Sequence, residues 1–139
     1  FLMPDRKYML RLPWPDKALS PNASNGTKWQ RMKAYSSKKK ARGDTWAATT
    51  AIGAHLQDWA DGADLRFDFF PPDRRKRDIQ NMPAMFKGHI DGIADALGVD
   101  DSLFRLYWPP EFSDPIGGGV VLVTIVPRVV GVPLSGVVT

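Results

Sequence analysis

The sequence contains no cysteine among its 139 residues. Disulfide bonds, cysteine-based zinc fingers and thiol catalysis are therefore excluded. Histidine is scarce too: there are two, His55 and His89, and this argues against a metal site built from imidazoles. A chain without cysteine fits the reducing interior of a cell, and we expect a cytoplasmic protein.

Long apolar runs are missing as well. The most apolar region, residues 120–138, is interrupted by Pro127, Arg128, Gly131 and Pro133, which leaves no run long enough to cross a bilayer. No signal peptide is visible. The basic segments do not lie opposite a large apolar stripe, as a helix at a membrane surface would require, so we expect no membrane partner.

Acidic residues are absent from one segment that is rich in cations. Between Lys28 and Arg42 there are seven Lys or Arg residues and no Asp or Glu, and Lys38, Lys39 and Lys40 are consecutive. The net charge of the whole chain is +4. This distribution favours an anionic partner, with nucleic acid as the leading polyanion.

The composition, 43% hydrophobic and 24% charged, is that of an ordinary globular protein, so we expect residues 1–139 to form one domain. Residues 8–15, "YMLRLPWP", predict a short strand, and the turn formers of Ser20–Trp29 predict a loop. Residues 65–70, "LRFDFF", alternate apolar and polar side chains, which predicts a half-buried strand.

A first helix is predicted within Ser36–Ala60, with Gly62 at its end. Its apolar positions keep roughly to one face: Trp46, Ile52, Leu56 and Trp59. Trp46 and Trp59 are better explained as core residues than as platforms for stacking bases.

A second helix is predicted from Pro83 to Leu97, with Gly98 just past its end. Its apolar stripe consists of Phe86, Ile90, Ile93 and Leu97. Further strands are expected in "VDDSLFRLYW" and in "GGGVVLVTIV". The order of elements predicts a small α+β domain with a mixed sheet and two principal helices.

The stretch "DRRKRDIQNM", residues 73–82, places four cations directly before Asp78: Arg74, Arg75, Lys76 and Arg77. Like charges repel, so this arrangement suggests that an anion binds there. Each part also has a simpler explanation, because a basic run often forms a solvated face and a lone Asp often caps a helix.

The same choice arises farther along the chain. Asp100 and Asp101 after Gly98 are consistent with a turn, and Lys87 with Asp91 is consistent with a surface ion pair. These residue types also suit phosphodiester cleavage, which needs carboxylates to hold Mg²⁺ and cations to attract phosphates. For Asp78 and Asp101 to share a metal, the chain must fold back after Gly98 and bring both to the same end of the sheet.

Taken together, these residues resemble the RusA family of Holliday-junction resolvases, small dimeric Mg²⁺-dependent endonucleases common in phages and prophages. The resemblance covers most of residues 8–126, is strongest in residues 65–126 and leaves the tail 128–139 unassigned. It is carried by "LPWP" (12–15), "LSPN" (19–22), "PDRRKRDIQN" (72–81), "KGHIDGI" (87–93) and "GVDDS" (98–102).

The resemblance implies a RusA-like fold and a homodimeric endodeoxyribonuclease that acts on four-way or other branched DNA in recombination and repair. The catalytic residues that it implies are Asp78, Lys87 and Asp101. Asp78 and Asp101 would bind Mg²⁺, or Mn²⁺ in its place, with help from Gln80. The DNA would be held by Arg74, Arg75, Lys76, Arg77, Asn81, Lys38, Lys39 and Lys40.

The sequence departs from the family pattern in two places. About three extra residues separate Asn81 from Lys87, and Gln80 stands where the family has its second acid. A Gln amide can ligate Mg²⁺ but carries no charge, which weakens the attraction for a hard cation. Either Asp78 and Asp101 hold the metal with Gln80 assisting, or one of three other acids substitutes, or cleavage is lost while binding of branched or single-stranded DNA remains. Those acids are Asp73, Asp91 and Asp100.

Overall fold

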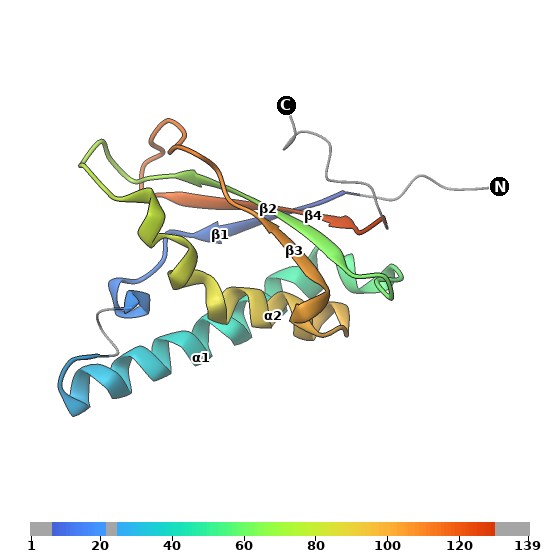
Figure 1. Ribbon diagram of the computed structural model, residues 1–139, viewed down its shortest axis with the longest axis horizontal. Helices are drawn as coiled ribbons and strands as arrows, with labels where there is room; N and C mark the ends of the chain where they lie inside the picture. The colour runs from blue at the N-terminus through green and yellow to red at the C-terminus, as the bar shows by residue number, and fades with distance from the viewer. Residues whose placement is uncertain (1–6, 22–24, 130–139) are drawn as a thin grey trace.

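The computed structural model describes residues 7–21 and 25–129. They form a four-stranded mixed sheet in the order β1–β4–β2–β3, with two principal helices against it (Figure 1). Strand β4 runs antiparallel to β1 and β2, whereas β3 runs parallel to β2. The bounds are β1 Tyr8–Pro13, α1 Lys28–Ala51, β2 Ala63–Phe70, α2 Lys87–Leu97, β3 Phe104–Tyr107 and β4 Val120–Pro127. The predicted α+β architecture is confirmed.

Short 3-10 turns connect these elements. They are η1 Lys17–Leu19, η3 Ala54–Leu56, η4 Ile79–Asn81, η5 Pro83–Phe86 and η6 Asp101–Leu103. No helix in the described part of the chain is both long enough and apolar enough to span a membrane. Most of the tail that the sequence left unassigned, from residue 130 onward, lies outside the described residues.

Strand β2 buries the side chains of one face in the core. Leu65, Phe67 and Phe69 are fully buried, whereas Arg66 and Asp68 on the other face are partly exposed. The rings of Phe67 and Phe69 both lie 5.6 Å from that of Phe86, which brings η5 down onto the sheet. The period-2 prediction for this strand is confirmed.

Helix α1 begins earlier than the sequence predicted, at Lys28, inside the segment expected to be a loop. The reason is a capping box, because the Thr27 hydroxyl accepts from the Gln30 amide while the Gln30 side chain accepts from the Thr27 amide. These two hydrogen bonds satisfy amides that would otherwise lack partners, so the helix starts despite the turn-rich composition before it.

Helix α1 also ends earlier than predicted. Gly53, not Gly62, stops it in the left-handed conformation with φ of 79°. Trp59 therefore lies beyond the helix, yet it is only 2% exposed, and its Nε1 donates to the Ala54 carbonyl at 2.7 Å. Trp46 was expected in the core but is 48% exposed, because α1 turns Thr45 and Thr49 inward instead.

Helix α2 matches its predicted stripe. Phe86, Ile90, Ile93 and Leu97 are buried, and Gly98 ends the helix with φ of 70°. The first residues of the predicted segment, 83–86, form the 3-10 turn η5 rather than α-helix.

Two glycines of α2 allow it to cross α1 at close range. A Cβ atom on Gly88 would lie 2.7 Å from the Lys38 carbonyl oxygen, and one on Gly92 would lie 2.4 Å from that of Arg42. Both distances are too short for real atoms, so side chains are excluded here. The basic segment of α1 is thereby pressed directly against the start of α2.

Candidate functional site

Lys87 is the first residue of α2, and its amine joins two carboxylates. Its Nζ lies 2.7 Å from Oδ2 of Asp101 and 2.9 Å from Oδ1 of Asp91. Asp91 comes one helical turn later, while Asp101 begins η6, after the chain has reversed beyond Gly98. The pairing of Lys87 with Asp91 was the simpler explanation considered from the sequence, and the reversal was stated there as a condition for a shared metal. We call Lys87, Asp91 and Asp101 the Lys87 cluster.

Pairing of β3 with β2 fixes the position of Asp101. Strand β3, which follows η6, is joined to β2 by two hydrogen bonds from Arg105 to the buried Asp64, at 2.6 and 2.8 Å. Ala63 of β2 pairs with Phe104, the first residue of β3. The turn that carries Asp101 is thus fixed to a core strand within three residues.

The electrostatics of the cluster favour a permanently charged amine. The hydrogen bonds from Lys87 to Asp101 and Asp91 raise the pKa of Lys87 above its usual value. It therefore stays protonated at neutral pH, where it can stabilise negative charge but cannot act as a base. The side chains remain open to solvent, with exposed fractions of 54% for Lys87 and 36% for Asp101.

A second charged pair borders the cluster. The Arg42 guanidinium of α1 donates to both carboxylate oxygens of Asp95 on α2, at 2.6 and 2.9 Å. This bond keeps the pKa of Asp95 low and that of Arg42 high. The charge of Asp95 is thereby neutralised by Arg42. The Lys87 cluster, in contrast, has two acids and one cation.

Lys87 also lines a cleft of about 290 Å³ between residues 18–21, α1 and the η5–α2 segment. Arg31 and Lys38 of α1 line the same cleft, together with the Tyr35 ring, and none of its lining residues is acidic. We call this cavity the Lys87 cleft. Three cationic residues around a cleft without acids make it attractive to a phosphate group. Arg31 belongs to the acid-free segment recognised in the sequence, although it is not among the individual DNA-binding residues predicted there.

Asp78 stands apart from these residues. Its Oδ1 accepts from the Gln80 amide at 3.0 Å and caps η4, which is the simpler role considered from the sequence. Asp78 follows the Phe70 end of β2, whereas Asp101 precedes the residue that pairs with Ala63, so they approach from opposite ends of that strand. In Figure 1 the yellow-green turn η4 lies before the start of α2, and the orange turn η6 lies near its other end.

The expectation that both acids reach the same end of the sheet is therefore not met. A parallel β2–β3 pair requires a crossover, and α2 carries the chain back along the strand before β3 begins. The ligand set of Asp78, Gln80 and Asp101 stays a prediction.

The basic run divides into two halves. Arg77 donates to Asp73 Oδ1 at 2.9 Å, and its guanidinium lies 5.6 Å from the centre of the Trp14 ring, so it holds the loop in shape. Arg75 also lies near Asp73, at 3.9 Å. Arg74 and Lys76 are exposed, and neither forms an ion pair with a residue in the described ranges, which leaves them available to phosphates.

The remaining predicted DNA contacts are all on the surface. Lys38 lines the Lys87 cleft, Lys39 is exposed on α1, and Lys40 forms an ion pair with Asp44 one turn later. Asn81 is exposed at the end of η4. The structure places these residues where a polyanion can reach them.

The donor set suits a magnesium ion if Asp91 is included. Across residues 7–21 and 25–129, no three His, Asp or Glu side chains gather into a metal site by themselves. Mg²⁺ needs fewer, because it usually takes one or two carboxylates and completes its shell with water and substrate phosphates. Asp91 and Asp101 both lie within 2.9 Å of one amine, so two carboxylates meet at one place.

Asp91 is also the best placed of the three substitute acids. Asp73 is bound by Arg77. The Asp100 carboxylate accepts hydrogen bonds from the hydroxyl and the amide of Ser102, and both lower its pKa. The signal for Asp91 was present in the sequence as its spacing of four residues from Lys87. Its distance to Asp101 depends on the fold and was not predictable.

The chain is similar to a protein of Xylella fastidiosa. No family model matches the chain. An uncharacterized protein of Xylella fastidiosa (strain Temecula1 / ATCC 700964) is 42% identical over 120 residues, which cover 84% of this chain and 74% of that protein. At this identity and coverage, the chain belongs to the same protein family as the Xylella fastidiosa protein.

Proposed function

We propose that the protein is a Mg²⁺-dependent, structure-selective endodeoxyribonuclease of the RusA type, which cleaves Holliday junctions or other branched DNA. One arrangement carries the proposal: the Lys87 amine binds Asp91 and Asp101, and Lys87 also lines a cleft with Arg31 and Lys38. Carboxylates for a metal thus lie beside cations for a phosphate. The resemblance of residues 72–102 to that family supports the same function.

Each group has a distinct role in this proposal. Arg31 and Lys38 bind the phosphate next to the cleaved bond, and Lys87 stabilises the negative charge that grows on the scissile phosphate. Asp101 and Asp91 hold the metal ion. When bound, Mg²⁺ supplies Lewis-acid activation of the phosphate and of the attacking water. Lys87 must then exchange contact with the carboxylates for contact with the phosphate, which its long, exposed side chain allows.

The surrounding cations hold the DNA. Arg74, Lys76, Lys39 and the remaining basic residues of α1 contact backbone phosphates, which position a duplex but do not read its sequence. A homodimer would present two such sites and nick opposed strands of a four-way junction symmetrically. The proposal places the protein with the DNA of a bacterial cell, in the cytoplasm.

A nicking assay on a synthetic four-way junction tests the proposal. Purified protein with Mg²⁺ should nick the junction, should cut linear duplex of the same sequence far less, and should stop when the metal is chelated. Asp91→Asn should reduce the rate more than Asp78→Asn, because Asp91 shares Lys87 with Asp101. A larger loss in Asp78→Asn would restore the ligand set that the family resemblance implies.

A binding module without nuclease activity is the rival function. Two observations favour it: Asp78 caps η4, and the position that is acidic in the RusA family is Gln80 here. Tight, salt-sensitive junction binding with no nicking in Mg²⁺ or Mn²⁺ would establish it. Gln80→Asp adds a direct comparison, since gain of strong cleavage in this variant would show that the natural protein has shifted towards binding.

A further inference from the structure

Helix α1 exposes large apolar side chains near its N-terminus. Trp29, Met32 and Tyr35 follow one another at intervals of three residues, so they lie on neighbouring turns of the helix. Their exposed fractions are 69%, 60% and 70%. Single apolar residues on a surface are common, but three in succession on one segment indicate a contact surface. The proposed function gives Trp29 and Met32 no role. We call these three residues the α1 apolar face.

The first turn of α1 is held in place by local interactions. The capping box between Thr27 and Gln30 fixes the turn that contains Trp29. The Lys33 amine lies over the Trp29 ring, 5.5 Å from its centre, which is within the range of a cation–π contact. The indole is thus positioned while most of its surface stays open to solvent.

A groove of about 290 Å³ lies beside Met32 and Tyr35. Its other lining residues are Lys28, Arg31 and Ser36, and none of the described residues that line it is acidic. The groove shares Arg31 and Tyr35 with the Lys87 cleft, so the two depressions meet at these side chains. A DNA strand with one phosphate in the Lys87 cleft can therefore continue past Tyr35 onto the α1 apolar face.

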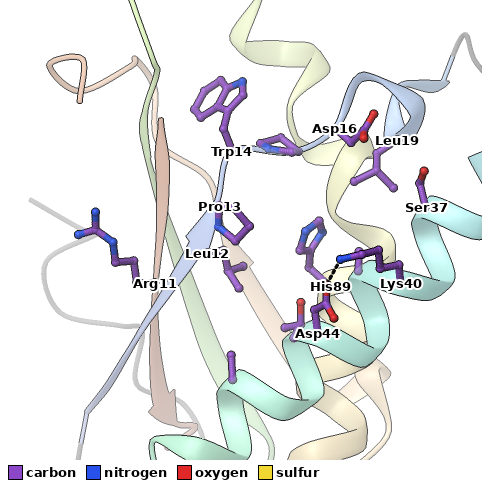
Figure 2. A pocket seen from close by; sticks show the side chains of 14 residues that line it. Arg11, Leu12, Pro13, Trp14, Asp16, Leu19, Ser37, Lys40, Asp44 and His89 are labelled. Atoms are coloured by element: carbon purple, nitrogen blue, oxygen red, sulfur yellow. Dashed lines mark hydrogen bonds and ion pairs between the residues drawn. The ribbon is translucent and has the colours of Figure 1, made fainter. Parts of the chain in front are cut away.

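Two acids near the start of α1 do not line this groove. Asp44, the first acid of the helix, comes nine residues after Tyr35, which is about two and a half turns and places it on the opposite side. Figure 2 shows Asp44 paired with Lys40 on the side of α1 that faces η1 and the end of β1. Asp16 lines a hollow beside Trp29 together with two cations, Lys17 and Lys33. Positive charge therefore prevails along the whole face.

The charges around the α1 apolar face select its partner. A second copy of this chain would bring two acid-free cationic segments together, and like charges repel. An acidic membrane would need a continuous apolar stripe, but Lys39, seven residues after Met32, interrupts the stripe on the same side of the helix. Single-stranded DNA offers phosphates for the cations and bases whose flat faces stack on aromatic rings. In a duplex these faces are covered by neighbouring base pairs.

We propose that the α1 apolar face binds a short unpaired segment of the DNA substrate, next to the phosphate in the Lys87 cleft. The inference rests on the proposed function, because it takes that cleft as the place of cleavage. Arg31 contacts the phosphate between the two depressions, Tyr35 stacks on the first unpaired base, and Met32 with Trp29 receives the next.

The length of the face limits the length of the unpaired segment. Trp29 and Tyr35 are six residues apart, which corresponds to ~9 Å along the helix axis and spans about two or three nucleotides. Stacking on aromatic rings tolerates every base, so the face recognises the absence of pairing and not a sequence. The preferred substrate is therefore branched DNA with a few unpaired nucleotides beside the cleavage point, in preference to a fully paired junction.

The first experiment measures binding in EDTA, where cleavage does not occur. It compares two fluorescent probes, an oligothymidylate of about 12 nucleotides and an abasic chain with equally many phosphates. Both carry the same charge, so a difference in affinity reports contacts with the bases. The oligothymidylate should bind about tenfold more tightly, and the ratio should persist as salt is raised, because stacking is not electrostatic. Equal affinities for the two probes would overturn the proposal.

Variants of exposed residues locate the contact. Tyr35→Leu and Trp29→Leu should each lower the ratio to about threefold or less. Trp46→Leu, which changes an exposed indole ~25 Å along α1 from Trp29 and outside the groove, should keep it. Circular dichroism should show that all three variants are folded. If Trp46→Leu lowers the ratio as much as Tyr35→Leu does, the assignment to the α1 apolar face is wrong.

The same variants test the other partners. Binding of the protein to phosphatidylserine vesicles, or its self-association in sedimentation, is compared with the probe ratio in Tyr35→Leu. If Tyr35→Leu abolishes either of these interactions and leaves the probe ratio unchanged, the face belongs to a membrane or to a second copy, and the proposal is overturned.

The second experiment compares single-turnover nicking of two four-way junctions, one fully paired and one with about two unpaired nucleotides in each strand at the branch point. The junction with unpaired nucleotides should be nicked about tenfold faster. Tyr35→Leu should remove this advantage, and Trp46→Leu should retain it. Equal rates for both junctions in the natural protein would overturn the proposal. Failure of the nuclease function would look different, because neither junction would be nicked while the oligothymidylate still bound more tightly than the abasic chain.

Discussion

Lys87 contacts both acids of the proposed metal site and also lines the cleft proposed to bind phosphate. Its amine binds Asp91 and Asp101, and the residue also lines a cleft together with two further cationic residues, Arg31 and Lys38. An exposed ion pair of this kind contributes about 0–1 kcal/mol to folding, so its value for stability is small. A functional role explains the arrangement better than a structural one.

Lys87→Met should therefore separate activity from stability. Loss of charge stabilisation at the scissile phosphate is expected to lower the nicking rate about 100- to 1000-fold. The thermal midpoint should change little, because the Lys87 side chain is 54% exposed. Rates in single turnover and melting curves by circular dichroism provide the measurements.

Lys39→Met is the matched control, since Lys39 is exposed on α1 and outside the cleft. It should nick nearly as fast as the natural protein at saturating DNA. If Lys87→Met melts much earlier and loses activity only in proportion to its unfolded fraction, Lys87 is a structural residue.

His89 makes the stability of the protein depend on pH. Burial lowers its pKa from 6.5 to about 4, so the unfolded chain binds a proton more readily than the folded one between these values. The free energy of unfolding should be constant above pH 6.5 and should fall by about 3 kcal/mol as the pH decreases to 4.

Urea unfolding at pH 7, 5.5 and 4.5 measures this dependence. His89→Gln should flatten it over that range, whereas His55→Gln, which replaces an exposed histidine, should leave it unchanged. A natural protein whose stability is equal at pH 7 and 4.5 would contradict the burial of a neutral His89.

At the scale of elements, the crossing of α1 and α2 decides where the cations lie. Gly88 and Gly92 let the backbone of α1 approach α2, and this contact brings Lys38 to the cleft beside Lys87. The acid-free segment of α1 thus lies close to Lys87 because Gly88 and Gly92 of α2 have no side chains.

Gly92→Ala should disturb this crossing. The added methyl group would meet the Arg42 carbonyl oxygen at 2.4 Å, so one helix must shift, and overpacking of this kind costs about 1–3 kcal/mol. Nicking should fall with it, since the cleft changes shape. Gly43→Ala is the control, because nothing lies within 4 Å of its Cβ position and alanine favours helix by about 1 kcal/mol. Chemical denaturation of both variants should give changes of opposite sign; equal changes would contradict the close crossing.

The sequence predicted the elements whose signals are local. The alternation in β2, the stripe of α2 and the stop at Gly98 are periodic or conformational features of a few residues, and the structure confirms them. The limits of α1 were wrong, because the capping box at Thr27 and the turn at Gly53 outweighed the composition on which the prediction relied. The assignment of Trp46 to the core was also wrong. Its exposure depends on which face of α1 meets α2, and the sequence does not show that face.

The site was predictable in part for the same reason. Lys87 and Asp91 are neighbours by helical spacing, and their pairing needs no knowledge of the fold. The contact with Asp101 requires the reversal after Gly98, which was anticipated only as a condition. The separation of Asp78 from Asp101 follows from the parallel register of β2 and β3, a long-range property that no local pattern carries.

At the scale of the whole molecule, positive charge is spread over one long helix and one loop. In Figure 1 the N-terminal half of α1 reaches beyond the rest of the fold, and most of its cations are exposed. DNA contacts distributed in this way act through release of counterions, so affinity should depend strongly on salt.

Measured at several salt concentrations, junction affinity should fall linearly on a double-logarithmic plot. Lys38→Gln should reduce the slope by about one, because it removes one phosphate contact, and should weaken binding to every sequence alike. Lys7→Gln, which changes the exposed residue immediately before β1, should leave the slope as it is. An unchanged slope in Lys38→Gln would remove the Lys87 cleft from the DNA interface.

The most direct test of the proposed nuclease centre is the single-turnover nicking rate of Asp101→Asn on a four-way junction in Mg²⁺. Junction affinity is measured on the same sample. The side chain of Asp101 is exposed enough that the variant should fold and bind DNA as before. We predict that binding persists while nicking falls at least about 100-fold. Nicking at the natural rate in Asp101→Asn would contradict the assignment of Lys87, Asp91 and Asp101 as the nuclease centre.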